Sequence, residues 1–294
     1  KKIIKGGFFM TRRRFPVGKT LLYVFMSLWA LTTIYPFIWV ILNSFKPRGL
    51  IRSDTFSLPI GDKFTLENYV TAFKRVDIGT AYVNSIVISG AVTVVGMVLA
   101  GLAAYAMVRY SFRLRGFLHS MIIASMMFPV FSTIIPVFRM ESSWGIVNTG
   151  SIWLTRLSVV LPQIAGNLSF AIIVLMGFIR SLPVDLEEAA YLEGYNVYQI
   201  FFRIIMPLAK PSFATVGIFT FLWSYNDLFL QMFFLRSKKF FTITRLLNEI
   251  SSQAGTNYGL MVAAVVMVVI PVLVVYIFLQ NYIIKGMTAG AVKG

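Results

Sequence analysis

Six long apolar runs constrain this chain more than any other feature of its sequence. Each run has about 20 residues or more and is nearly free of charge, which is the length needed to cross about 30 Å of hydrocarbon. A backbone inside lipid finds no water to hydrogen-bond, so each run is predicted to be helical. The first run is too long for a secretory signal peptide and lacks its small-residue cleavage site, so it is expected to be a span as well. The six predicted spans are 20–42, 82–108, 117–138, 157–178, 213–235 and 260–284.

The composition fits a chain whose surface faces lipid. Of the 294 residues, 57% are hydrophobic and only 13% are charged, whereas soluble domains average about 45–50% apolar and about 25% charged residues. This excludes a soluble enzyme, a disordered chain and a nucleic-acid-binding domain, in spite of the net charge of +16. With no cysteine and one histidine, a disulfide scaffold and a thiolate metal site are excluded too. We therefore expect an all-α integral membrane protein with no catalytic residue and no metal site.

The basic residues predict the orientation of the spans. With six spans both ends lie on one side, and 15 of the 27 Lys and Arg residues fall on that side. The short segments carry most of the signal, and residues 1–19 and 109–116 each contain three clustered arginines. We therefore place both termini in the cytoplasm, with 1–19 and 285–294 as cytoplasmic ends of one membrane domain at 20–284. Lipid or nucleic-acid recognition by the arginine clusters is the alternative.

The cytoplasmic connection 179–212, between the fourth and fifth spans, contains signals for a short helix. Pro183 and Asp185, with Glu188 three residues later, form a helix start of the capping-box type. Gly194 supplies the left-handed residue that ends such a helix at low steric cost. A helix that starts and stops within ten residues, outside the apolar runs, is predicted to protrude from the membrane.

A second helix is predicted directly after this break. Asn196 can cap it, and Pro207 and Pro211 close it before the fifth span. Its apolar residues at helical spacing on one face are Val197, Ile200, Phe201 and Ile204. A short helix, a sharp turn and an amphipathic helix suit docking into a groove of a soluble partner. The alternative is an interfacial helix that lies on the membrane.

The same connection resembles the EAA motif of the binding-protein-dependent ABC importer permeases. The family pattern is E-A-A, three residues, G, nine residues, then I-x-L-P. It is matched here by Glu188, Ala189, Ala190, Gly194, Ile204 and Pro207, with Met206 in the place of Leu. The likeness extends to N-S-F-K-P at 43–47, N-S at 84–85, A-A-Y-A at 103–106 and the tail 286–294. These stretches resemble the carbohydrate-uptake branch, of the maltose-permease type.

The resemblance implies a type I ABC importer permease fold with six transmembrane helices, in the bacterial cytoplasmic (inner) membrane. It implies a second homologous permease, two ABC ATPase subunits, an extracytoplasmic solute-binding protein and a sugar of oligosaccharide size as partners, besides membrane lipid. The EAA residues would contact the ATPase, and the tail around Gly290 to Lys293 would reach toward it. ATP and Mg²⁺ would be bound by the ATPase alone, because this chain has no GxxxxGK[ST] stretch. The chain is thus expected to be no enzyme, to hold no cofactor and to bind no nucleic acid.

The fifth span contains the candidates for the translocation pathway. Asp227 is the carboxylate that falls within a predicted span, and an ionisable group at membrane depth is a candidate functional group. Asn226 and Trp223 lie beside it. Two roles stay open for these three residues, which are lining of the pathway and hydrogen bonding between helices. The family often shows W-N-(D/E)-F followed by W-P-L at this place, and this chain departs from it, so the stretch does not identify the sugar.

Two further hypotheses compete with a neutral-sugar importer. The predicted outer segments hold a surplus of basic residues that includes Lys238, Lys239 and Arg245, which would steer an acidic substrate such as a uronic-acid oligosaccharide. Docking of a binding protein or anchoring to lipid headgroups explains the same surplus. The other competing class is an ion-gradient-coupled secondary transporter, which is expected to show inverted repeats and paired intramembrane charges. Neither feature is found in this sequence.

Overall fold

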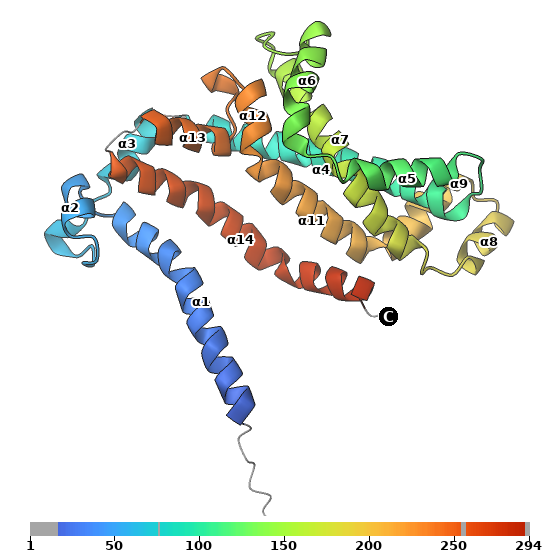
Figure 1. Ribbon diagram of the computed structural model, residues 1–294, viewed down its shortest axis with the longest axis horizontal. Coiled ribbons are helices and arrows are strands. Elements are labelled where there is room, and N and C mark those ends of the chain that lie inside the picture. Colours follow the sequence, from blue (N-terminus) through green and yellow to red (C-terminus); the bar gives the residue numbers. More distant parts are fainter. Residues whose placement is uncertain (1–16, 76, 254–256, 292–294) are drawn as a thin grey trace, which may run out of the picture.

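The computed structural model describes residues 17–75, 77–253 and 257–291, and in these ranges helices alternate with turns without any strand. The all-α prediction is confirmed. Figure 1 labels most of the elements. In chain order they are α1 (Val17–Ser44), α2 (Arg48–Ser53), η1 (Gly61–Lys63), α3 (Glu67–Arg75), α4 (Ile78–Arg109), α5 (Arg115–Ser125), α6 (Val130–Ser143), α7 (Ile152–Ile179), α8 (Asp185–Leu192), α9 (Val197–Ile200), η2 (Phe201–Ile205), α10 (Met206–Leu208), α11 (Lys210–Asn226), α12 (Leu228–Phe234), η3 (Lys238–Phe240), α13 (Ile243–Gln253) and α14 (Tyr258–Ala291).

Four single helices of the described chain, namely α1, α4, α7 and α14, are long and apolar enough to cross a membrane. Two bent pairs raise the number to six if each counts as one span: α5 with α6, bent by 105°, and the segment Val197–Leu208 with α11, bent by 83°. Six spans therefore agree with the structure.

Two of the predicted spans are not single helices, contrary to expectation. The run 117–138 breaks between Ser125 and Val130, because Pro129 has no N–H to continue the helix and instead precedes the first turn of α6. The run 213–235 breaks at Asp227, which separates α11 from α12. The helix of the sixth predicted span, α14, runs past the predicted end at residue 284 and continues to Ala291.

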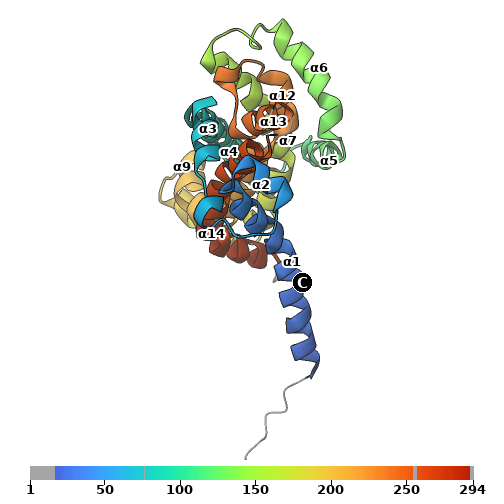
Figure 2. The same ribbon diagram turned by 90° about the vertical axis from the view of Figure 1, so that its left-hand side faces the viewer.

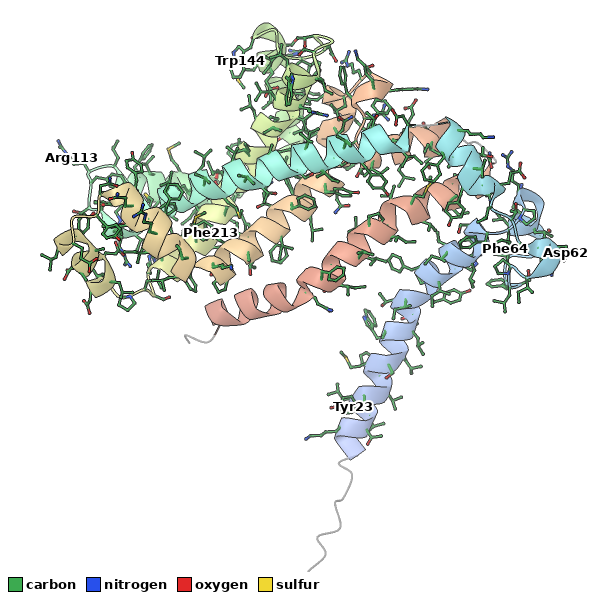
Figure 3. All side chains as sticks on the ribbon, turned by 180° about the vertical axis from the view of Figure 1, so that it is seen from behind. Tyr23, Asp62, Phe64, Arg113, Trp144 and Phe213 are labelled. Atoms are coloured by element: carbon green, nitrogen blue, oxygen red, sulfur yellow. The ribbon has the colours of Figure 1, made fainter. Side chains whose placement is uncertain are left out.

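Helix α4 forms the centre of the molecule and packs against α7 and α11. Two clusters of buried apolar side chains follow one another along it. One includes Ile88 and Val92, and the other includes Ala100 and Ala104. Helix α1, in contrast, projects from the rest of the molecule (Figures 1 and 2). Its side chains from residue 18 to residue 38 are exposed, as Tyr23 illustrates in Figure 3, so that this surface is available to lipid or to another subunit.

The connection 43–81 lies at the opposite end of the molecule from α8 and α9 (Figure 1). Gly49, Pro59 and Gly61 predict irregular structure for it, which is wrong in part, since α2, η1 and α3 occupy nearly half of it. Helix α3 has a strongly one-sided apolar face, so its burial against α14 stabilises a helix that is too short to persist alone.

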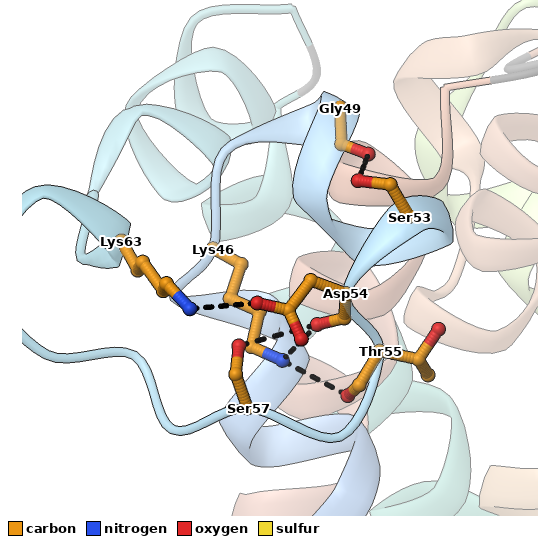
Figure 4. A network of polar contacts seen from close by, with 7 residues as sticks. All are labelled: Lys46, Gly49, Ser53, Asp54, Thr55, Ser57 and Lys63. Carbon is orange, nitrogen blue, oxygen red and sulfur yellow. Dashed lines mark hydrogen bonds and ion pairs between the residues drawn. The ribbon is translucent and has the colours of Figure 1, made fainter.

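A buried lysine organises this connection (Figure 4). Lys46 is fully buried, and its Nζ donates to the backbone carbonyls of Asp54 and Thr55, both at 2.9 Å. The Asn68 side chain donates to the carbonyls of Ser44 and Lys46 at 2.9 and 2.8 Å. Burial lowers the pKa of Lys46, and the carbonyl oxygens supply the partners that a buried ammonium requires.

Candidate functional site

The connection 179–212 begins with helix α8, as predicted, but its start is formed differently. The residue before the helix is Val184, and no side chain caps the first turn. The capping-box interaction predicted for Asp185 and Glu188 is therefore wrong. Instead the first turn holds three carboxylates, which interact favourably with the positive end of the helix dipole.

The break after α8 and the second helix start agree with the prediction. Gly194 has φ +84°, and its N–H donates to the Tyr191 carbonyl at 3.0 Å. Asn196 then caps α9 in a reciprocal pair with Gln199, since the Gln199 N–H donates to Asn196 Oδ1 at 2.9 Å and the Asn196 N–H to Gln199 Oε1 at 2.8 Å. Both bonds together fix the direction in which the chain returns toward the membrane.

The buried face of the second helix differs from the expected one. Ile200, Phe201 and Ile205 are fully buried, whereas Val197 is exposed and Ile204 only half-buried. The cause is η2, a turn of π-helix over Phe201–Ile205. A π turn contains one residue more than an α turn, so the residues that follow it shift along the helix surface.

The residues of the motif face two ways. Four residues of the motif are exposed, namely Glu188, Ala189, Gly194 and Pro207. Ala190, in contrast, is buried in the cluster that includes Ala100 and Ala104 of α4. The exposed part of α8 also includes the side chains of Asp185, Leu186, Tyr191 and Leu192. Helix α8 lies at one end of the molecule (Figure 1).

The neighbouring Glu187, which was not among the residues predicted from the sequence, is buried. Its carboxylate accepts from Arg109 Nε at 2.5 Å and from the Tyr105 hydroxyl at 2.8 Å. Arg109 also donates from Nη2 to the Leu182 carbonyl at 3.0 Å. Only 11% of the Arg109 side chain and 5% of the Glu187 side chain are exposed. The signal for this pair was an arginine directly after a predicted span, which was interpreted as a topology signal, with lipid or nucleic-acid recognition as the alternative.

The three pathway candidates meet at the break between α11 and α12. Asp227 accepts from the Leu230 N–H at 3.2 Å and so caps α12. Its other oxygen accepts from Gln163 Nε2 at 2.9 Å. Gln163 is fully buried in α7, and its Oε1 accepts from the Ser224 hydroxyl at 2.6 Å. The Asp227 carboxylate thus holds the broken span in shape, through contacts from α7.

A cavity of about 690 Å³ opens beside this break. Trp223, Asn226 and Asp227 all line it, and both Trp223 and Asn226 are exposed. Its remaining lining residues are Pro129, Val130, Phe131, Ile134, Phe219, Leu222, Leu228, Phe229 and Leu230. The structure therefore brings the three candidates together in one apolar cavity that has an amide and a carboxyl group in its wall.

The other predicted features are placed as follows. Gly290 lies in the last turns of α14, and Lys293 falls outside the described residues. Arg245 is paired with Glu249 at 3.1 Å, while Lys238 and Lys239 are exposed near η3. Within the described ranges, no three His, Cys, Asp or Glu residues gather in a group that could hold a metal ion.

Known proteins match this chain over most of its length. It is 33% identical over 273 residues to the diacetylchitobiose uptake system permease protein NgcG of Streptomyces coelicolor, which covers 92% of this chain and 88% of that protein. It is 30% identical over 287 residues to the arabinooligosaccharides transport system permease protein AraQ of Halalkalibacterium halodurans, covering 97% and 100%.

A solved structure shares the fold. A chain from a bacterial ABC transporter involved in the import of the acidic polysaccharide alginate superposes with a TM-score of 0.78 at 24% identity, over 90% of this chain and 96% of that chain. Residues 93–289, from within α4 almost to the end of α14, match the family of inner membrane components of binding-protein-dependent transport systems. The chain belongs to this family, and it is a multi-pass membrane permease that works with a solute-binding protein, not an enzyme.

Proposed function

We propose that this chain is a permease subunit of an ATP-driven importer of sugars, and that the connection 179–212 is its coupling loop. The observation that carries the proposal is the two-sided placement of α8. Ala190 and Glu187 anchor the helix to the membrane bundle, and Glu188, Ala189 and Gly194 stay exposed on its other side. A helix held on one side and free on the other can bind a soluble subunit and pass its motion on.

The proposed assembly contains a second homologous permease, two ATPase subunits and an external solute-binding protein, with both termini of this chain in the cytoplasm. ATP and Mg²⁺ are bound by the ATPase subunits. In support, the curated relatives are named as permeases of ABC transporters or uptake systems. Family membership favours this mechanism over the ion-gradient-coupled alternative.

Carbohydrate is the substrate class that fits the cavity at the break of span five. A sugar ring has apolar C–H faces and hydroxyl groups around its edge. The cavity offers aromatic side chains from Trp223, Phe131 and Phe229, together with the amide of Asn226 and the carboxyl of Asp227. Apolar walls with few polar groups are typical of ligand sites. Two relatives are named for the uptake of diacetylchitobiose and of arabinooligosaccharides.

Co-purification in detergent tests the coupling loop. The chain is expressed with its neighbouring permease and ATPase genes, and Gly194→Asp is compared with Gly145→Asp. Both glycines have positive φ, and a Cβ would meet no atom within 4 Å at either position, so the two variants suffer a similar backbone strain. We expect Gly194→Asp to lose the ATPase and Gly145→Asp to retain it. Equal retention by both variants would contradict the coupling-loop assignment.

Single-cysteine labelling tests the orientation. Because the chain has no cysteine, Glu193→Cys and Thr149→Cys each introduce one thiol, at opposite faces of the proposed topology. A membrane-impermeant maleimide added to intact cells is expected to label Thr149→Cys only. Labelling of Glu193→Cys from outside would reverse the assignment.

An acidic oligosaccharide remains the second candidate substrate. Lys238 and Lys239 are exposed in η3, between α12 and α13, whereas the third predicted steering residue, Arg245, is engaged by Glu249. Replacing both lysines by Gln is expected to slow uptake of a uronic-acid oligosaccharide and to leave a neutral one unaffected. Equal effects on both sugars would refute electrostatic steering.

A further inference from the structure

Three residues at four-residue spacing along α4 contact the connection 179–212. They are Gly101, Tyr105 and Arg109, which lie in one row near the end of the helix, because residues four apart are neighbours on a helix surface. All three contact the connection, and Gly101 also contacts Phe213 of α11. Together they join one long helix of the bundle to the whole proposed coupling loop.

The contact at Arg109 is a buried ion pair with Glu187 of α8. The Tyr105 hydroxyl donates to the second carboxylate oxygen, so that both oxygens of Glu187 are engaged by α4. The Tyr105 ring also lies 5.7 Å from the ring of Phe201 in η2. A charge pair with additional hydrogen bonds has few alternative geometries, so α8 and the end of α4 are held in a fixed relation.

Gly101 lets aromatic side chains of two other elements approach the α4 backbone closely. A Cβ atom at this position would lie 2.7 Å from the Phe213 ring and 2.9 Å from the Phe201 ring. These rings belong to α11 and η2, and Figure 3 labels Phe213 in the region where α4 and α11 pass each other. The missing side chain therefore lets two aromatic rings sit directly on the α4 backbone.

At its other half, α4 contacts the break of span five. The hydroxyl oxygens of Ser89 and Ser224 lie 3.2 Å apart, and the Ser224 hydroxyl donates to Gln163 Oε1 at 2.6 Å. Gln163 in turn donates to Asp227 at the wall of the cavity. One uninterrupted helix thus contacts the connection 179–212 near one end and is linked, in its other half, through Ser224 and Gln163 to Asp227 in the cavity wall.

We propose that Glu187, Tyr105 and Arg109 form a joint through which the connection 179–212 moves α4, and that α4 carries this displacement to the cavity at Asp227. The three are positioning residues, since none of them lies on the exposed side of α8 or in the cavity. Two adjacent carboxylates then have opposite roles: Glu188 faces the soluble partner and Glu187 faces the membrane bundle. This proposal rests on the proposed function and adds the internal route of the motion.

The test measures a nucleotide-dependent change at the cavity in the assembled transporter. Asn226→Cys places a thiol in the cavity wall, and the rate of its reaction with a maleimide is measured with and without a non-hydrolysable ATP analogue and Mg²⁺. This needs no knowledge of the sugar. ATPase retention is measured on the same preparation, because it separates failure of assembly from failure of transmission.

Two single substitutions weaken the contacts of the joint. Glu187→Gln removes the charge, and Tyr105→Phe removes one hydroxyl while keeping the aromatic packing. We expect both variants to retain the ATPase and to reduce the nucleotide effect on the labelling rate, on the order of tenfold for Glu187→Gln. The reversed pair, Arg109→Glu with Glu187→Arg, is expected to restore part of the effect. Glu193→Gln, an exposed carboxylate beside the same helix, is the matched control and should change nothing.

Three outcomes would overturn the joint. An unchanged nucleotide effect in both Glu187→Gln and Tyr105→Phe shows that α4 is moved by other contacts. Loss of the ATPase in Glu187→Gln, with Tyr105→Phe normal in retention and response, assigns Glu187 to ATPase binding. If the unaltered chain never retains an ATPase, the proposed function itself fails, and the joint fails with it.

Discussion

Two buried cations, at opposite ends of the molecule, are satisfied in different ways. Arg109 pairs with the carboxylate of Glu187, and the two residues are 78 positions apart in the chain. Lys46 binds two backbone carbonyls, of Asp54 and Thr55, only eight and nine positions away. Arg109 therefore joins two helices that are distant in the sequence, whereas Lys46 links positions within a single loop.

The difference indicates different mechanical roles. A long-range pair of opposite charges fixes two elements to each other, so that motion of one is motion of both. A lysine that binds carbonyls of its own loop stiffens that loop, but these bonds do not couple the motion of the loop to that of other helices. The connection 43–81 is accordingly expected to act as a rigid surface, and the connection 179–212 as a transmitting element.

Breaking the long-range pair should have the largest effect on stability. Arg109→Met leaves the Glu187 carboxylate buried with Tyr105 as its remaining side-chain partner, and removing one member of a buried pair costs about 3–5 kcal/mol. A marked fall in the thermal unfolding temperature in detergent is expected. The control is Arg113→Met in the same turn, an arginine that projects outward in Figure 3 and should leave the temperature nearly unchanged. Equal unfolding temperatures for the two variants would remove the distinction between the regions.

The corresponding change at the opposite end should be smaller and local. Lys46→Met leaves the carbonyls of Asp54 and Thr55 without their donor, at a cost of about 1–3 kcal/mol. Hydrogen exchange is expected to quicken within residues 43–75 and to stay unchanged in α8. Lys63→Met, which removes a half-exposed partner of Asp54, should have a weaker effect. Faster exchange in α8 after Lys46→Met would show that the two ends are not independent.

Close packing at Gly101 gives the third prediction. Gly101→Ala forces the Phe201 and Phe213 rings apart, which costs about 1–3 kcal/mol, and the better helix propensity of alanine offsets about 1 kcal/mol of that. Gly96→Ala is the matched control in the same helix, since a methyl group there meets no atom within 4 Å and should be neutral or stabilising. Unfolding temperatures of the two variants that do not differ would contradict the close approach.

The smallest expected effect is a response of the connection 43–81 to acid. Hydrogen bonds from Lys63 and Ser57 lower the pKa of Asp54 below its usual value of 3.8. A carboxyl whose pKa is lower in the folded state stabilises the fold above pH 3.8, and this contribution is lost as the pH falls through the folded-state value. Hydrogen exchange of residues 54–63, corrected for its intrinsic pH dependence, should therefore quicken slightly in strong acid. In Asp54→Asn this extra response should be absent.

The sequence predicted most of this fold because lipid imposes a simple rule on composition and length. Four spans follow from that rule alone. The break at Pro129 had a visible cause in the sequence, but hydropathy averages over it and counts a single span. The break at Asp227 also had its signal, since the one carboxylate in the span turned out to cap α12. The sequence identified that residue without predicting that the helix ends there.

The candidate site was predictable only where local chain geometry decides it. Gly194 and the Asn196 cap follow from preferences of single residues. The distinction between Glu187 and Glu188 does not, because adjacent carboxylates at the start of a helix look alike until the position of α4 is known. The shift of the buried face from Ile204 to Ile205 likewise arises from the π turn, for which the apolar spacing gave no sign.

The π turn also bears on how this region can change during evolution. Because η2 contains one residue more than an α-helical turn, deleting any one of its five residues could restore regular α-helix. Everything on one side of the deletion would then rotate by about 100° relative to the other side. Such a deletion would turn the exposed side of α8 away from its present direction without altering a single motif residue. We therefore expect the length of the segment between Gly194 and Pro207 to be under stronger selection than the identity of most residues within it.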